Sequence, residues 1–195
     1  TDLSKVSKVT ATGEYFPGDR ENGAIFKHAS MMAATAMIKA AKEITDRRLS
    51  EKLIEFAYWM IELVLPYNTL KNPYVNCGNP RWCTQYINSN TGEHIGPTLS
   101  GTATWLALAL FEMLGISYHG NKLIINPMLS KYEEHIEYTL RYLDSFYFIS
   151  IRKPKGLYRI KDNKCILTLD NEVLTDNIIT LEDDKKHHYI NLTFV

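Results

Sequence analysis

The sequence predicts a mixed α and β protein, with helices in the first part of the chain and short strands in the rest. Apolar residues recur at helical spacing before residue 117. After it, short segments rich in β-branched and aromatic residues alternate with turn residues. We therefore predict a helical domain over 1–117 and an antiparallel β-sandwich domain over 118–195.

Three helices are predicted in the helical domain. The first covers about 24–44, and the second follows Ser50, a candidate N-cap, and ends before Pro66. The third covers 99–115 and has no charged residue before Glu112, so it should be buried among other helices. Two helices cannot surround a third, so we expect further helices outside this chain. The apolar positions of the first helix are Ile25, Ala29, Met32, Ala33, Ala36, Ala40 and Ile44.

Short strands are predicted throughout the second domain. They cover 122–126, 136–143, 146–152, 157–160, 166–169, 178–181 and 189–194. Between the second and third helices, a polar stretch over 68–97 is rich in Asn, Gly and Pro. We predict a long irregular loop there, and such loops are usually functional.

Composition and charge exclude several classes of protein. Basic and acidic residues balance at 22 each, with eleven of each sign in 1–117, so neither domain attracts nucleic acid or an anionic membrane. No apolar run is long enough to span a bilayer. The cysteines Cys77, Cys83 and Cys165 match neither a disulfide framework nor a zinc site. They indicate buried thiols in a cytoplasmic protein without a metal, and the start at Thr1 indicates a piece of a longer one.

A charged turn just before the first helix is the first candidate site. Pro17 and Gly18 mark a turn that presents Asp19, Arg20 and Glu21, and such side chains suit the hydroxyls of a sugar. The alternative is a solvated helix start, in which the carboxylates favour the helix dipole.

The second candidate is an anion site at the start of the third helix. Ser100, Gly101 and Thr102 combine free backbone N–H groups, a glycine that allows close approach and two hydroxyls. Simple N-capping is the alternative. His28, on the shoulder of the first helix, is either a ligand-binding residue or a core histidine.

These segments resemble glycoside hydrolase family 94, the cellobiose phosphorylase group. The family carries stretches similar to Glu21-Asn-Gly-Ala-Ile-Phe-Lys-His28 and Leu99-Ser-Gly-Thr-Ala-Thr-Trp105. The segments 73–77, 114–116 and 123–127 also look like the family's, in the same order. The loop over 79–94 looks more like the branch that acts on β-1,2- or β-1,3-linked oligoglucans.

The resemblance implies a fold and an activity. The chain would be the C-terminal part of an (α/α)6 barrel, residues 1–117, followed by a C-terminal antiparallel β-sandwich domain, residues 118–195. The enzyme would be a glycosyltransferase-type sugar phosphorylase, a homodimer at full length, which converts a β-linked glucoside or oligoglucan and inorganic phosphate into α-glucose 1-phosphate with inversion. Phosphate is a substrate there, and no cofactor is implied.

The resemblance also implies roles for individual residues. His28, Ser100, Gly101 and Thr102 would hold phosphate. The sugar would contact Tyr15, Arg20 and Glu21, although Arg20 replaces a lysine of the cellobiose enzymes. The family's acidic motif is absent, so the aspartic acid that protonates the glycosidic oxygen is expected upstream of this chain.

Two other functions stay open. The first is a hydrolase or glucan-processing domain on the same barrel, which differs from a phosphorylase in not requiring phosphate. The second is a non-catalytic module whose β domain binds glycan or supports an interface.

Overall fold

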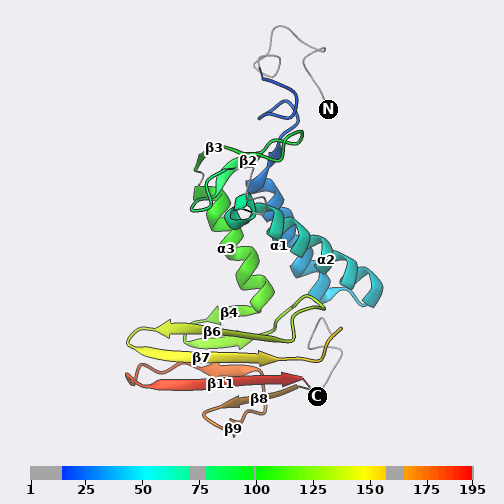
Figure 1. The fold of residues 1–195 in the computed structure, drawn as a ribbon. Coiled ribbons are helices and arrows are strands. Elements are labelled where there is room, and N and C mark those ends of the chain that lie inside the picture. Colours follow the sequence, from blue (N-terminus) through cyan, green and yellow to red (C-terminus); the bar gives the residue numbers. More distant parts are fainter. Residues whose placement is uncertain (1–14, 71–77, 99, 157–164, 195) are drawn as a thin grey trace. The chain divides into compact units, whose positions relative to one another are not determined.

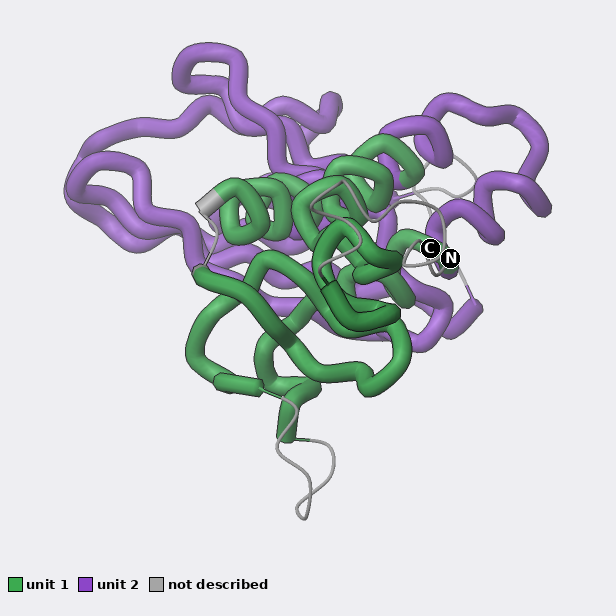
Figure 2. The backbone as a smooth tube through the Cα atoms, turned by 90° about the horizontal axis from the view of Figure 1, so that it is seen from above, with its two compact units in different colours: residues 1–37, 56–109 green, residues 38–55, 110–195 purple. Residues whose placement is uncertain are grey.

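The computed structural model describes residues 15–70, 78–98, 100–156 and 165–194 (Figure 1). These residues contain three α-helices and eleven strands in three sheets. The chain divides into two compact units, unit 1 with residues 1–37 and 56–109 and unit 2 with residues 38–55 and 110–195 (Figure 2). The predicted strand over 157–160 lies outside the described residues.

The helices form near the predicted positions, and their ends differ by a few residues. They are α1 (Lys27–Glu43), α2 (Arg47–Val64) and α3 (Ser100–Leu114). The N-cap of α2 is Asp46 and not Ser50, because Asp46 Oδ1 accepts the Leu49 N–H at 3.1 Å. Ser50 is buried one turn inside the helix, where its hydroxyl donates to the Ala41 carbonyl at 2.8 Å.

The predicted apolar face of α1 was wrong. The apolar residues of α1 that are fully buried are Met31, Ala34, Ile38 and Ala41, whereas Met32 is 44% exposed. Because alanines occur around most of the helix, the apolar period fits more than one face, and the periodicity alone could not choose between them.

The polar stretch predicted as a loop forms a sheet in unit 1. β1 (Ile25–Phe26), β2 (Thr84–Ile87) and β3 (His94–Thr98) pair antiparallel, with β2 in the centre. A short 3-10 helix, η2 (Pro66–Leu70), lies between α2 and β2 in the chain. The sheet joins the segment before α1 to the middle of the former loop, so it holds the two halves of the candidate site together.

Unit 2 contains the other two sheets. A three-stranded sheet has the order β10-β5-β4, and a five-stranded sheet has the order β6-β7-β11-β8-β9. Their strands are β4 (Ile116–His119), β5 (Lys122–Ile125), β6 (His135–Tyr142), β7 (Ser145–Arg152), β8 (Cys165–Leu169), β9 (Glu172–Val173), β10 (Ile178–Thr180) and β11 (His187–Phe194).

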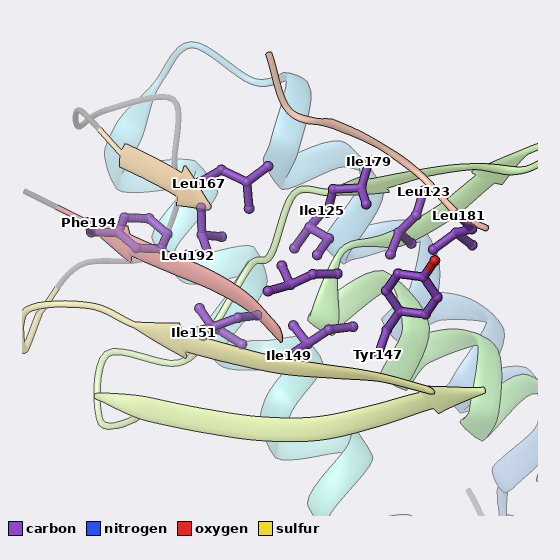
Figure 3. Close-up of a cluster of buried hydrophobic side chains, with 12 residues drawn as sticks. Leu123, Ile125, Tyr147, Ile149, Ile151, Leu167, Ile179, Leu181, Leu192 and Phe194 are labelled. Carbon is purple, nitrogen blue, oxygen red and sulfur yellow. The ribbon is translucent and has the colours of Figure 1, made fainter. Parts of the chain in front are cut away.

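The core of unit 2 contains residues of both sheets. Leu123 and Ile125 of β5 belong to one buried cluster with Ile149 and Ile151 of β7 and Leu192 of β11 (Figure 3). Tyr147 is also buried there, and its hydroxyl accepts the Glu182 N–H at 2.7 Å. Alternating residues of β7 and β11 thus face this core, and the residues between them face the other side of the sheet.

The predicted fold class was wrong. The described residues form a small α/β structure with three α-helices and short sheets, and not a part of an (α/α)6 barrel. The five-stranded sheet is not purely antiparallel either, because β7 and β11 run parallel. Strand propensity cannot show pairing direction, and a parallel pair requires a crossover that short turns between neighbouring strands do not suggest.

Candidate functional site

The turn before α1 is held in place by the loop between β2 and β3. Asn22 is fully buried, and its side-chain amide donates to the Tyr15 carbonyl at 2.9 Å. The Asn90 side-chain amide donates to the Pro17 carbonyl at 2.6 Å. Two amide side chains therefore fix the turn from inside and from the neighbouring hairpin.

Two residues of this turn have left-handed backbone conformations. Gly18 has a φ of 87°, and a Cβ atom there would lie 2.8 Å from Asn88 Oδ1, so only glycine fits. Arg20 has a φ of 42°, which is uncommon for a residue with a side chain. Such conformations cluster at functional sites, because the surrounding structure must compensate for them.

The predicted sugar-binding residues lie together on this turn. The Arg20 guanidinium lies 5.0 Å from the centre of the Tyr15 ring, and its Nη1 donates to the Tyr15 hydroxyl at 3.4 Å. Glu21 accepts a hydrogen bond from the Tyr86 hydroxyl at 3.2 Å. Asp19 Oδ1 is buried and has no hydrogen-bond partner among the described residues. The turn therefore presents a cation and a carboxylate, and it contains a buried acceptor that is unused.

His28 lies beside the start of α3. A Cβ atom on Gly101 would come within 3.0 Å of both Cε1 and Nδ1 of the His28 ring, so glycine makes room for the imidazole. Thr102 is fully buried, and its Oγ1 has no hydrogen-bond partner among the described residues. The structure thus brings together His28, Gly101 and Thr102, while the Ser100 side chain lies outside the described part of the chain.

A row of rings connects the two groups of residues. Phe26 and Tyr86 are paired across β1 and β2, with ring centres 5.4 Å apart. Phe26 also contacts His28 edge to face at 5.6 Å, and the His28 ring lies 6.4 Å from Trp105. Since Tyr86 binds Glu21, contacts run without a break from the charged turn to the start of α3. Sequence reasoning missed Tyr86, because it lies in the stretch predicted as a loop.

A buried lysine lies next to His28 in sequence, and sequence reasoning assigned no role to it. Lys27 is fully buried, and its Nζ donates to Thr84 Oγ1 at 2.8 Å. The distance from Lys27 Nζ to His94 Nδ1 is also 2.8 Å. The one signal for this cluster was a charged residue at the start of a helix that has no other Lys, Arg, Asp or Glu before Lys39.

Burial shifts the pKa values of this cluster. Burial lowers the pKa of Lys27 to about 8. Burial, with a smaller contribution from the charge of Lys27, lowers the pKa of His94 to about 4. Burial also raises the pKa of the Cys83 thiol, which lies near Lys27. At neutral pH the imidazole of His94 is therefore uncharged and accepts the hydrogen bond from Lys27.

The described residues contain neither a membrane-spanning helix nor a group of metal ligands. None of their helices has both the length and the apolar character that crossing a bilayer requires. No three His, Cys, Asp or Glu side chains among them are grouped so that they could hold a metal ion. Cys83 and Cys165 are free thiols, and Cys77 lies outside the described part of the chain.

Comparisons with known proteins gave distant structural matches only. No family model matches the chain, and no curated protein sequence matches it. Matching solved structures include a family GH92 α-mannosidase from Bacteroides thetaiotaomicron, with 14% identity and a TM-score of 0.33. The same mannosidase in complex with mannoimidazole matches with 12% identity and a TM-score of 0.33. Each match covers 94% of this chain and 19% of the mannosidase chain.

The identification with glycoside hydrolase family 94 was wrong. The two solved structures named above belong to a different glycoside hydrolase family, and no family model supports family 94. The resemblance depended mainly on two short stretches, 21–28 and 99–105. Glycine with hydroxyl residues at a helix start occurs in unrelated folds, because every helix must satisfy its first N–H groups.

Proposed function

We propose that unit 1 is part of a carbohydrate-active enzyme that binds inorganic phosphate beside a saccharide. The observation that carries the proposal is the position of His28 against Gly101 at the start of α3, with the unpartnered Thr102 hydroxyl in the same turn. An imidazole N–H and the free N–H groups of a helix start can all donate to an anion, and together they favour one with several oxygens. The unpartnered hydroxyl supplies a further donor.

The saccharide would lie on the turn that precedes α1. Tyr15, Arg20 and Glu21 offer a ring face, donors and an acceptor, and Asp19 has an unused buried oxygen. Sugar hydroxyls need donors and acceptors side by side, which this set provides. The contacts through Tyr86 and Phe26 give the turn and the anion site a fixed relation within unit 1.

The reaction proposed is phosphorolysis of a glycosidic bond. A phosphate oxygen would attack the anomeric carbon, the bond from that carbon to the glycosidic oxygen would break, and the leaving oxygen would take a proton. The products would be a sugar phosphate and a shortened saccharide. No described residue is assigned as the proton donor.

The free thiols Cys83 and Cys165 agree with a cytoplasmic location.

Phosphate binding tests the proposal directly. We expect calorimetric titration of the 195-residue chain with inorganic phosphate to give a saturable site. Thr102→Val should weaken it by about 1–3 kcal/mol, since a charged ligand loses one hydrogen bond. His28→Ala should weaken it as well. Thr104→Val, at an exposed threonine of the same helix, is the matched control and should bind normally.

Two outcomes would contradict this assignment. One is the absence of saturable phosphate binding, and the other is equal weakening by Thr102→Val and Thr104→Val. Turnover separates phosphorolysis from hydrolysis: in the complete protein, cleavage of a saccharide should depend on added phosphate and release a sugar phosphate. We expect the 195-residue chain alone to turn the saccharide over about 10²–10⁴-fold more slowly than the complete protein, because none of its described residues is assigned as the general acid.

A further inference from the structure

The face of the five-stranded sheet that points away from the unit 2 core carries both aromatic and polar side chains. Along β7, the residues that alternate with the buried ones are Phe146, Phe148, Ser150 and Arg152. Along β11 they include His187, Tyr189, Asn191 and Thr193. Rings therefore come first on both strands, and polar side chains follow.

The parallel pairing of β7 and β11 places like residues next to each other. Tyr189 pairs with Phe148, and Asn191 pairs with Ser150. On the other side of β7, Glu137 of β6 pairs with Ser150. Side chains of paired residues lie on the same face of a sheet, so an aromatic row and a polar row run across neighbouring strands.

The aromatic row forms a small platform. The rings of Phe148 and Tyr189 are 5.4 Å apart and nearly parallel, with an angle of 21° between their planes. Phe148 also contacts His187 edge to face at 5.4 Å. Tyr189 is 56% exposed, so much of its ring faces solvent. The platform is thus open on one side.

The polar row lies beside this platform in a shallow depression. The depression has a volume of about 380 Å³ and is lined by Phe148, Tyr189, Ser150, Asn191, Glu137 and Arg152, among others. That volume is within the range of small-molecule sites. His135 of β6 contacts two side chains of the polar row. Its Nε2 lies 3.0 Å from the Ser150 hydroxyl and 3.1 Å from the Glu137 carboxylate, so it holds both in position.

We propose that this depression is a binding site for a neutral oligosaccharide, separate from the site in unit 1. A pyranose ring has a face of C–H groups, which pack on the electron-rich face of an aromatic ring, and a rim of hydroxyls. The platform of Tyr189 and Phe148 fits the C–H face. Amide, hydroxyl and carboxylate groups of Asn191, Ser150 and Glu137 fit the rim. This inference does not depend on the proposed function of unit 1.

The charge of the depression favours a neutral ligand over a nucleic acid. Its lining includes one carboxylate, Glu137, and one guanidinium, Arg152, so no positive excess is present to bind phosphates. Exposed rings on a sheet can also stack bases, as in single-strand RNA-binding domains. Glu137 in the polar row would repel the backbone of such a strand.

The experiment is an NMR titration of the 195-residue chain with short neutral oligosaccharides of glucose, mannose, galactose and xylose. We expect at least one of them to shift the backbone amides of Tyr189 and Asn191 and the Asn191 side-chain amide. Tyr189→Ala should weaken that binding about tenfold, since the platform loses its exposed ring. Asn191→Ala should weaken it less. The matched controls are Tyr132→Ala, at a tyrosine that is 72% exposed elsewhere in unit 2, and Thr193→Ala, both expected to bind normally.

Three results would overturn the proposal. The first is that none of the four oligosaccharides shifts these signals. The second is that Tyr132→Ala weakens binding as much as Tyr189→Ala. The third is that single-stranded oligo(dT) or oligo(U) shifts them while no saccharide does. Because Tyr189 and His28 lie in different units, phosphate binding should be unchanged in Tyr189→Ala, so a failure of either site is seen separately.

Discussion

Gly101 and His28 form a pair whose coupling can be measured. A methyl group on Gly101 would meet the His28 ring at 3.0 Å, so Gly101→Ala must displace the imidazole. In a helix, alanine is otherwise about 0.8–1.0 kcal/mol more favourable than glycine. We therefore expect Gly101→Ala to stabilise the chain in a His28→Ala background and to stabilise it less, or to destabilise it, when His28 is present.

Urea unfolding of the four chains in this cycle gives the coupling free energy. Equal effects of Gly101→Ala in both backgrounds would mean that the ring and the glycine do not touch in solution. Gly101→Ala should also weaken phosphate binding in the wild-type background, because the imidazole no longer lies over the start of α3.

Two of the candidate residues of unit 1 that lie far apart in the sequence come close together in the structure, although the sequence did not predict their surroundings. Gly101 and Thr102 were chosen because their residue types suit an anion, and His28 because of the family resemblance; the structure places His28 against Gly101, the residue before Thr102. The cluster around Lys27 was missed, since its partners Thr84 and His94 lie in a stretch without a recognisable strand pattern. Pairing between distant segments cannot be deduced from local propensity.

At the scale of single elements, the N-terminus of α2 offers a simple test. Asp46 Oδ1 accepts the Leu49 N–H at 3.1 Å and caps the helix. We expect Asp46→Ala to lower the free energy of unfolding by about 1 kcal/mol, and Asp46→Asn to restore most of it, because asparagine caps almost as well. Denaturant unfolding measures both variants. The control is Glu43→Ala, at the exposed end of α1. If this variant lost as much free energy of unfolding as Asp46→Ala, the effect would not be due to capping.

The strands show where sequence reasoning about elements stops. β5, β6, β7, β8, β10 and β11 lie within two residues of the predicted strands, since β-branched and aromatic residues mark them clearly. β2 and β3 were missed because Gly, Pro and Asn in the same stretch predicted a loop, and β1 was missed because its residues were included in the first predicted helix. The parallel direction of β11 could not be foreseen either, since alternation looks the same in both directions.

At the scale of the whole molecule, two histidines should shape the dependence of stability on pH. Burial lowers the pKa of His94 to about 4 from 6.5. Its unfolded form binds more protons between those values, so stability should fall as the pH falls from 6.5 towards 4. The hydrogen bond with Asp170 raises the pKa of His188, helped by Asp184. The stabilisation of the folded chain by protonated His188 is complete below pH 6.5, and it is lost as the pH rises through the pKa of His188 in the folded state.

Together these shifts predict greatest stability near pH 6.5 as far as the two histidines are concerned. Thermal unfolding between pH 4 and pH 8 is the measurement. His94→Gln should reduce the slope on the acid side, and His188→Gln should reduce it on the alkaline side. A pH profile that neither variant changes would mean that both side chains titrate equally in the folded and unfolded states.

The order of the strands has a consequence for protein synthesis. β11 follows every other strand in sequence, yet it lies in the centre of the five-stranded sheet, between β7 and β8. On the ribosome, β7 and β8 are therefore complete before the strand that joins them exists, and each has an open edge. Chain growth at about 5–20 residues per second leaves these edges unpaired for seconds. Open edges invite pairing with other chains, so the nascent protein is most prone to aggregation in that interval.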